Sequence, residues 1–239
     1  MDERVKSSNK RDAASAVIFG ATGLVGGELW RTLEQDPAWS SVTCIGRRRP
    51  PGLGKHDRVK SVTTDLFDPS LYQQHLDANV VFICLGTTLK QAGSKAAFKR
   101  IDVDLPELIA THASRMGSQR LIVISAQGIH RNSLFFYNRA KADMEEKVRS
   151  AFQGDCCFIR PGLLLGERQE SRVAESLFAA FLTRIDGWIQ HSSMRKFRAI
   201  PARTVAQAMN RISQKERLPS IIENSALFDL GQSPGRGGS

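Results

Sequence analysis

Short apolar runs alternate along this chain with longer segments in which apolar residues recur three and four positions apart. The short runs predict buried strands over residues 16–19, 41–46, 59–63, 80–84, 121–124, 157–159 and 226–228. The longer segments predict helices over residues 24–33, 96–112, 136–148 and 204–212, with the second helix interrupted near Pro106. Because strands that alternate with helices indicate βαβ units, the predicted fold is α/β with a doubly wound, mainly parallel Rossmann sheet.

Polar and glycine-containing segments follow the predicted strands. In an open parallel sheet, ligands bind at the carboxyl ends of the strands, where these segments converge. The segment Gly20–Gly26 follows the first strand and opens the first helix. Gly20 permits a sharp turn, Gly23 lets the backbone approach a ligand, and Gly26 allows close packing of helix on strand. The helix N-terminus adds N–H donors and partial positive charge, so we predict a dinucleotide site rather than a plain turn.

Arginines follow the second predicted strand, where many NAD-binding proteins carry a carboxylate that holds the ribose 2′-hydroxyl. This chain has Gly46-Arg47-Arg48-Arg49 at that point. A carboxylate would repel a 2′-phosphate, whereas guanidinium groups attract it and bind it bidentately. We therefore predict NADP(H) as the cofactor, with Arg47 and Arg48 on the 2′-phosphate. The alternative is a solvated basic loop.

Tyr137 and Lys141 are four residues apart on a predicted helix and so share one of its faces. A nearby ammonium stabilises phenolate, and a tyrosine tuned in this way can exchange a proton with a carbonyl oxygen during hydride transfer. Ser125, at the end of the fifth strand, is placed to hold the substrate oxygen. The alternative for Tyr137 and Lys141 is an exposed helix face.

The chain resembles the atypical short-chain dehydrogenases/reductases, and among them the oxidoreductases of the Tat-interacting-protein type. The resemblance rests on residues 19–26, 45–48, 84–88, 123–126, 137–141 and 159–162, of which Cys84-Leu85-Gly86-Thr87-Thr88 and Ile45-Gly46-Arg47-Arg48 are the more specific. It implies that Tyr137 is the acid/base, Lys141 its partner and Ser125 the substrate-orienting hydroxyl. The cofactor-binding residues that it implies are Gly20, Thr22, Gly23, Leu24, Val25, Gly26, Arg47, Arg48, Asp65, Leu66, Leu85, Gly86, Thr87, Tyr137, Lys141, Pro161 and Gly162.

One segment departs from the resemblance. Many of these enzymes carry an asparagine on the helix after the fourth strand, where it maintains a proton relay, and the comparable segment Arg100–Asp104 has none in an obvious register. Two functions therefore stay open. The first is an NADP(H)-dependent oxidoreductase acting on a small carbonyl or alcohol substrate. The second is an NADPH-sensing regulatory or interaction protein with little turnover and a protein partner.

Charge and cysteine content indicate which partners and which metal sites to expect. The 34 basic and 24 acidic residues give a net charge of +10, but the basic residues are scattered and carry no nucleic-acid motif, so we expect no nucleic-acid partner. The four cysteines, Cys44, Cys84, Cys156 and Cys157, lie in or beside apolar runs without metal-site spacing. We interpret them as small buried hydrophobes and predict no metal site.

We expect one NAD(P)-binding domain over residues 15–230, with a substrate-side region at 163–200. Residues 1–14 and 231–239 are predicted to be flexible termini. No apolar run reaches the roughly 20 residues that a membrane-spanning helix needs. The first residues lack the apolar centre of a signal peptide and the acid-free, Arg-rich character of a transit peptide, so we expect a cytoplasmic protein.

Overall fold

Seven parallel strands form the central sheet of the computed structural model, which describes residues 14–54, 57–166 and 198–232. Their order across the sheet is β3-β2-β1-β4-β5-β6-β9. The strands are β1 (Ala14–Phe19), β2 (Trp39–Gly46), β3 (Val59–Thr63), β4 (Val80–Ile83), β5 (Arg120–Ile124), β6 (Asp155–Arg160) and β9 (Ile221–Glu223). This arrangement confirms the predicted doubly wound Rossmann sheet. Strands β2 and β3 lie on one side of β1, and β4 and the later strands lie on the other, so the strand order changes direction at β1.

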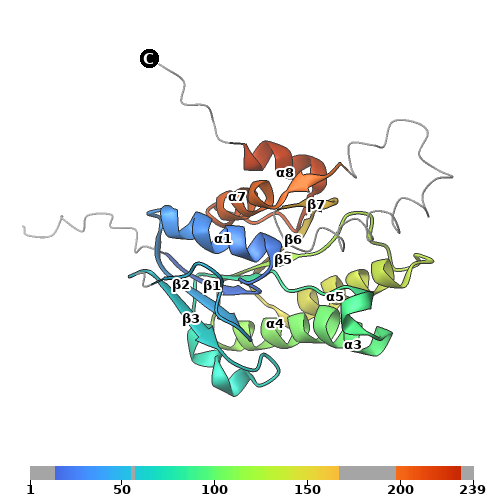
Figure 1. The fold of residues 1–239 in the computed structure, drawn as a ribbon, viewed down its shortest axis with the longest axis horizontal. Helices are drawn as coiled ribbons and strands as arrows, with labels where there is room; N and C mark the ends of the chain where they lie inside the picture. Colours follow the sequence, from blue (N-terminus) through green and yellow to red (C-terminus); the bar gives the residue numbers. More distant parts are fainter. Residues whose placement is uncertain (1–13, 55–56, 167–197, 233–239) are drawn as a thin grey trace, which may run out of the picture.

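Helices cover both faces of the sheet (Figure 1). One layer holds α1 (Leu24–Gln35), α7 (Ala202–Ser213) and α8 (Asn224–Gly231). The opposite layer holds α3 (Lys95–Lys99), the π-helical turn η3 (Arg100–Asp104), α4 (Leu105–Arg115) and α5 (Phe136–Ala151). Short elements complete the described chain: η1 (Pro69–Leu71), η2 (Gln73–His75), α2 (Leu89–Ala92) and a separate pair of two-residue strands, β7 (Leu164–Leu165) and β8 (Ile200–Pro201).

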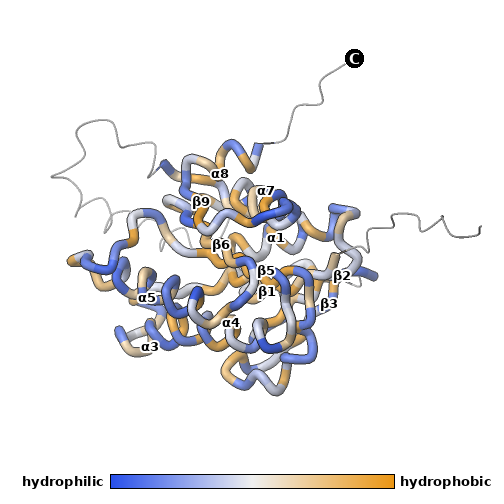
Figure 2. Tube along the Cα trace, turned by 180° about the vertical axis from the view of Figure 1, so that it is seen from behind, coloured by the Kyte–Doolittle hydropathy of each residue, from blue (hydrophilic) through white to orange (hydrophobic). Residues whose placement is uncertain are grey.

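Two hydrophobic cores lie on the two faces of the sheet, and β1 contributes to both. Ala16 and Ile18 belong to the core under α1 and α7, while Val17 and Phe19 belong to the core under α4 and α5. Successive side chains of a strand point to opposite faces, so a strand with helices on both sides is apolar throughout. The apolar colouring of the central strands in Figure 2 follows the same rule.

The predicted helix 96–112 is present but longer, and Pro106 does not interrupt it. Helical structure runs from Lys95 to Arg115, with Pro106 in the first turn of α4. Proline lacks the N–H that would bond to the preceding turn. The chain widens into a π-turn just before it, where the Leu105 N–H donates to the Arg100 carbonyl. The sequence therefore predicted the position of the disturbance but not its form.

The predicted strand at 226–228 is wrong, because these residues lie in α8. The strand is β9, five residues earlier, where Ile221 and Ile222 pair in parallel with β6. Leu227 is instead buried in the core beneath α1 and α7. A short apolar run cannot by itself distinguish a strand from one turn of a buried helix.

Several expectations lie outside the described residues: the N-terminal segment before residue 14, the tail after residue 232, and positions 167–197 of the predicted substrate-side region. No helix within the described ranges is both long enough and apolar enough to cross a bilayer.

Candidate functional site

The Gly-rich turn follows β1, the strand at which the strand order of the sheet changes direction. Gly20 has φ +86°, and a Cβ added there would lie 2.5 Å from the carbonyl oxygen of Cys84, at the end of β4. The Gly20 carbonyl accepts a hydrogen bond of 2.8 Å from the Gly23 N–H. A Cβ at Gly26 would lie 2.3 Å from the same carbonyl oxygen. Each of these two glycines is therefore required by close backbone packing, and together they fix the entry into α1.

The N-terminus of α1 has no side-chain cap. Gly23 is the N-cap residue and has no side chain to accept a hydrogen bond, and no acidic residue lies in the first turn. Leu24 and Val25 begin the helix; Val25 is buried, and Leu24 lies against Gly166. Thr22 stands within the turn itself. An uncapped helix start presents N–H donors and partial positive charge, which suits a pyrophosphate.

The loop after β2 presents arginines to solvent. Arg47 and Arg48 are exposed and form no hydrogen bond or ion pair with other residues that the structure describes. Arg49 differs, because its guanidinium donates to the carbonyls of Leu53 and Gly54 at 3.1 Å and 2.8 Å and so braces its own loop. Arg47 and Arg48, the two arginines predicted to bind a 2′-phosphate, are therefore the two whose guanidinium groups have no partner within the described structure.

The residues after β3 divide into one exposed and one buried position. The Asp65 side chain is exposed and accepts a hydrogen bond of 2.9 Å from the Phe67 N–H. Leu66 is buried, and its carbonyl accepts from the Tyr72 hydroxyl at 3.0 Å. Asp65 thus holds the turn in shape at the strand end, while the Leu66 side chain contributes to the core.

The loop after β4 is tied to the helices beneath it through Asp102. Leu85, Gly86 and Thr87 follow the strand, and Gly86 is exposed. The Thr87 N–H donates to Asp102 Oδ2 at 2.8 Å. Asp102 lies on the π-turn η3, and only 1% of its surface is exposed. A buried carboxylate therefore supports the loop along which the resemblance places a ribose.

Tyr137 and Lys141 lie on α5, one turn apart. The Lys141 ammonium is buried and lies 2.8 Å from Asp102 Oδ1. Burial tends to lower the pKa of Lys141, but Asp102, Tyr137 and Glu145 outweigh it, so that pKa is raised. The pKa of Tyr137 is also raised, chiefly because the surrounding protein desolvates the phenolate, although 38% of the residue is exposed; Lys141 opposes this rise and Asp102 reinforces it. Lys141 is thus held as a cation and Tyr137 as a neutral phenol.

Ser125 follows β5, and its Oγ is buried without a hydrogen-bond partner among the described residues. Its backbone N–H donates to the Ile159 carbonyl at 2.7 Å, which fixes it beside β6. Because a buried hydroxyl without a partner is costly, it marks a position where a ligand atom would be stabilised.

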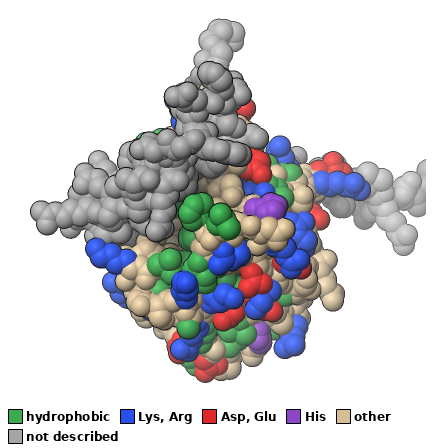
Figure 3. All heavy atoms as spheres, turned by 90° about the vertical axis from the view of Figure 1, so that its right-hand side faces the viewer, with side chains coloured by type: hydrophobic (Ala, Val, Ile, Leu, Met, Phe, Trp, Pro, Cys, Tyr) green, Lys and Arg blue, Asp and Glu red, His purple; other side chains and the backbone are tan. Residues whose placement is uncertain are grey.

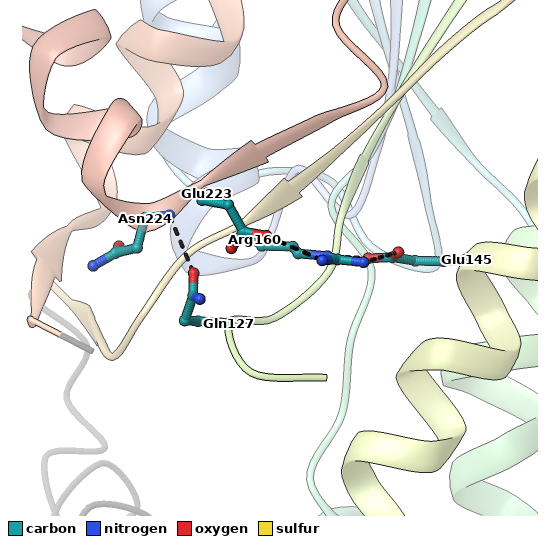
Figure 4. A network of polar contacts seen from close by, with 5 residues as sticks. All are labelled: Gln127, Glu145, Arg160, Glu223 and Asn224. Carbon is teal, nitrogen blue, oxygen red and sulfur yellow. Dashed lines mark hydrogen bonds and ion pairs between the residues drawn. The ribbon is translucent and has the colours of Figure 1, made fainter. Parts of the chain in front are cut away.

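The peptide after β6 is held by Gln127 and Asn224, which Figure 4 shows joined to each other. The Gln127 N–H donates to the Pro161 carbonyl at 2.9 Å, and the Gly162 N–H donates to Asn224 Oδ1 at 2.8 Å. The backbone N–H of Asn224 in turn donates to Gln127 Oε1 at 3.2 Å, so the Gln127 side chain is linked to the start of α8. Pro161 and Gly162 are therefore fixed relative to Ser125, which precedes Gln127 by two residues.

Arg160, the last residue of β6, connects α5 to β9 (Figure 4). Its guanidinium binds Glu145 bidentately at 2.9 Å and 2.6 Å, and it binds Glu223 at 3.0 Å. Glu145 lies one turn beyond Lys141 on α5. The ion pairs therefore fix the helix that carries Tyr137 and Lys141 against the sheet.

Comparison with known proteins agrees with this architecture. The family model described as the NAD dependent epimerase/dehydratase family matches residues 16–217. This chain belongs to that family. Rat protein HTATIP2 is 30% identical over 236 residues, which cover 96% of this chain and 94% of that protein. Protein fmp52, mitochondrial, of Emericella nidulans is 31% identical over 194 residues, covering 76% and 83%. The family match and these relatives confirm an atypical short-chain dehydrogenase/reductase of the Tat-interacting-protein type.

Solved structures of the epimerase/dehydratase type share the fold. MoeE5 in complex with UDP-glucose and NAD has a TM-score of 0.64 at 15% identity, covering 91% of this chain and 80% of that one. A short-chain dehydrogenase/reductase superfamily protein from Agrobacterium tumefaciens with bound NAD has a TM-score of 0.64 at 12% identity, covering 90% and 81%. The chain thus has the NAD(P)-binding oxidoreductase fold of its family.

The expected cytoplasmic location is wrong on these comparisons. The Emericella nidulans relative is named a mitochondrial protein, and so is Protein FMP52 of Candida albicans, which is 32% identical over 160 residues. An N-terminal sequence without a recognisable targeting signal is a weak basis for predicting a location, because it shows only which signals were not recognised.

The four cysteines of this family member agree with their interpretation as apolar residues. All are free; Cys44 and Cys157 are buried, while Cys84 and Cys156 are half-buried. Burial raises the pKa of each thiol to about 12, so each stays protonated and unreactive at neutral pH.

Sequence reasoning missed Asp102, although it lies in the segment where an asparagine was sought. The signal was available in the spacing: Phe98, Asp102, Leu105 and Ile109 recur four, three and four residues apart, and all are buried. An acidic residue on the apolar face of a helix needs a buried partner. That partner, Lys141, comes from a helix that follows more than thirty residues later.

Proposed function

We propose that this chain is an NADP(H)-dependent oxidoreductase that interconverts a carbonyl and an alcohol. The observation that carries the proposal is the arrangement on α5, where Tyr137 lies one turn from a buried Lys141 ammonium. Such a pair performs general acid/base chemistry at a carbonyl oxygen. Membership of an oxidoreductase-type family supports the same reaction class.

The residues at the carboxyl edge of the sheet fit a dinucleotide. The start of α1, whose N-cap glycine has no side chain, suits the pyrophosphate. The buried Oγ of Ser125 has no hydrogen-bond partner within the described ranges and lies on the side of Pro161 and Gly162. When bound, the dinucleotide would supply or accept the hydride at the substrate carbon. Arg47 and Arg48 are exposed and have no partner among the residues that the structure describes, which supports a 2′-phosphate and hence NADP(H) over NAD(H).

In this proposal each side chain has one task at the substrate oxygen. Ser125 Oγ orients that oxygen through a hydrogen bond. Tyr137 Oη gives its proton to the oxygen when the carbonyl is reduced and takes it back when the alcohol is oxidised. Lys141 stabilises the phenolate that is left after proton donation.

The central test is Tyr137→Phe, which removes the proton donor and keeps the ring. We expect reduction of the best substrate in an aldehyde, ketone and quinone panel to fall by about 10²- to 10⁴-fold. NADPH binding, measured by fluorescence titration, should stay within about twofold. Turnover at the wild-type rate would remove Tyr137 from the chemistry.

The cofactor assignment has its own test. Each guanidinium–phosphate bond contributes about 1.5–3 kcal/mol, so Arg47→Ala with Arg48→Ala should weaken NADPH at least tenfold and NADH little. Arg49→Ala is the matched control, because Arg49 is bound to its own loop. Equal loss for the two cofactors would refute a 2′-phosphate site at these arginines.

One observation favours a second function, a cofactor-sensing interaction protein. Leu134 and Phe135, just before α5, are 92% and 46% exposed. Figure 3 looks onto the right-hand side of Figure 1 and shows hydrophobic side chains gathered among basic ones on that face. Exposed apolar side chains beside a site suit either an apolar substrate or a protein partner. Tight NADPH binding with no turnover on the panel, and partner capture that changes with NADPH, would favour sensing.

The names of the fungal relatives support a mitochondrial location for this chain. Immunoblotting of purified mitochondria and cytosol tests it, and recovery in the cytosolic fraction alone would refute it.

A further inference from the structure

Asp102 is the buried carboxylate with which Lys141 of the Tyr137–Lys141 pair forms its ion pair in the described structure. We infer that Asp102 is a positioning residue, which holds and neutralises the Lys141 ammonium so that Tyr137 stays protonated and serves as the proton donor in carbonyl reduction. This inference rests on the proposed function and deepens it, because it assigns the protonation state in which Tyr137 meets the substrate.

The geometry gives the carboxylate two partners on two different elements. Oδ1 lies 2.8 Å from the Lys141 ammonium on α5, and Oδ2 accepts the Thr87 N–H from the loop after β4 at 2.8 Å. The side chains of Asp102 and Lys141 are 1% and 5% exposed, so water competes little with their interaction. A carboxylate with both oxygens engaged this way holds the lysine in one place and joins it to the loop at Gly86 and Thr87.

The π-turn supplies the reason that Asp102 reaches this position. In η3 the helix widens by one residue before Pro106, and such single turns recur at functional sites. Asp104, two residues later, lies on the exposed side of the helix. It binds the Lys147 ammonium at 3.4 Å, and 55% of the Asp104 side chain is exposed. One helical turn thus carries two Asp–Lys pairs to α5, one buried and one in water.

Charge balance gives the chemical consequence. A lone buried ammonium would stabilise phenolate, so that Tyr137 would act as a base toward an alcohol. Beside Asp102 the ammonium is neutralised, and the phenol keeps its proton. The charged groups that shift the pKa of Tyr137 are Lys141 from its own helix and Asp102 from η3, while Glu145 acts on Lys141 and is itself bound to Arg160.

The proton balance of the reduction follows. The O–H bond of Tyr137 breaks, its proton forms the new O–H bond of the alcohol, and the two electrons enter with the hydride that reduced dinucleotide supplies. The phenolate that remains is stabilised by Lys141 and regains its proton from solvent. A tyrosine that is protonated at neutral pH can donate this proton without first taking one up from solvent.

The chain contains only two tyrosines, which permits a test without turnover. In protein labelled with ¹³Cζ-tyrosine, NMR resolves the titration of Tyr137 from that of Tyr72, whose burial raises its pKa to about 12. Asp102→Asn keeps the size and one oxygen acceptor but removes the charge. We expect the first titration step recorded by Tyr137 to move to lower pH by about one to three units.

Asp104→Asn is the matched control, since it removes an aspartate from the same turn and breaks a pair to the same helix. Its Tyr137 titration should superimpose on that of the wild type. The inference is overturned if Asp102→Asn also superimposes on the wild type or moves to higher pH. Because the titration needs no substrate, it stays readable even if Tyr137→Phe shows that the proposed reaction is wrong.

A second variant covers loss of folding in Asp102→Asn. The double variant Asp102→Asn with Lys141→Met leaves neither member of the pair buried and unpaired. Since both charges are removed together, we expect Tyr137 to titrate within about one pH unit of the wild type. A larger displacement would show that the two charges do not offset each other, and would overturn the inference.

With a substrate in hand, the pH profile provides a further readout. In Asp102→Asn the fall of kcat/KM for reduction at high pH should begin at lower pH, because Tyr137 loses its proton at lower pH. A uniform loss in both directions with an unchanged profile would indicate a merely structural role for Asp102 and overturn the inference.

Discussion

Two adjacent glycines at the start of α1 predict opposite effects of the same substitution. At Gly26, an added Cβ would lie 2.3 Å from the Gly20 carbonyl oxygen, although real Cβ atoms keep at least 3.0 Å from such an atom. Both partners are backbone, so the turn or the helix must move by the difference. Forced overpacking of this kind costs about 1–3 kcal/mol. Gly26→Ala should therefore lower the free energy of unfolding by that amount, less the smaller gain from alanine inside a helix.

At Gly27, the nearest atom to an added Cβ is the Arg31 guanidinium Nη1 at 3.5 Å, an ordinary contact with a flexible side chain. Gly27 lies inside the helix, where alanine is favoured over glycine by about 0.5–1 kcal/mol. Gly27→Ala should therefore raise the free energy of unfolding. Both positions lie in α1, so the helical preference for alanine applies to both, and we expect the two variants to differ by about 1–3 kcal/mol.

Equilibrium unfolding in urea, followed by tryptophan fluorescence, measures both values. NADPH titration adds a second readout, because Gly26→Ala displaces the N–H donors of the phosphate turn and should weaken binding, whereas Gly27→Ala should leave it within about twofold. Equal stabilities of the two variants would show that the turn accommodates a side chain at Gly26. The argument for close backbone packing would then fail.

Two further predictions concern ion pairs and pH. Arg160→Met leaves the nearly buried Glu145 without its bidentate partner and should lower the free energy of unfolding by about 3 kcal/mol; Arg131→Met, which breaks the exposed pair with Glu146 on the same helix, should cost less than about 1 kcal/mol in the same urea titration. Comparable losses would refute the weight given to burial. Burial tends to raise the pKa of Asp36, but hydrogen bonds from Asn210, Ala38 and Gln214 and the charge of Arg58 outweigh it, so the pKa is lowered. A carboxylate whose pKa is lowered by folding stabilises the protein above its unfolded-state pKa, and this stabilisation is lost as the pH falls through its folded-state pKa. The wild type should therefore be more stable than Asp36→Asn at pH 7, and this advantage should shrink below about pH 4. An advantage that grows on acidification would contradict this prediction.

The elements near the N-terminus could be predicted because their causes are local. The apolar run before Gly20 and the spacing of Val25, Leu29 and Leu33 suffice to place β1 and α1, and all of these helix residues are buried. Prediction failed at residues 226–228, where a run of three apolar residues serves a helix rather than a strand. The pairing of Ile221 and Ile222 with β6 decides the matter, and that pairing depends on residues about sixty positions away.

For the candidate site, the sequence by itself determined the residue types and their order along the chain. The glycines of the turn, the arginines after β2, and Tyr137 with Lys141 could all be recognised, because each group lies within a few residues of sequence. Only the tertiary structure decided that Arg49 braces its own loop and that Asp102 binds Lys141. The strength of a charge interaction depends on burial and on partners from other elements, and neither property is encoded in local spacing.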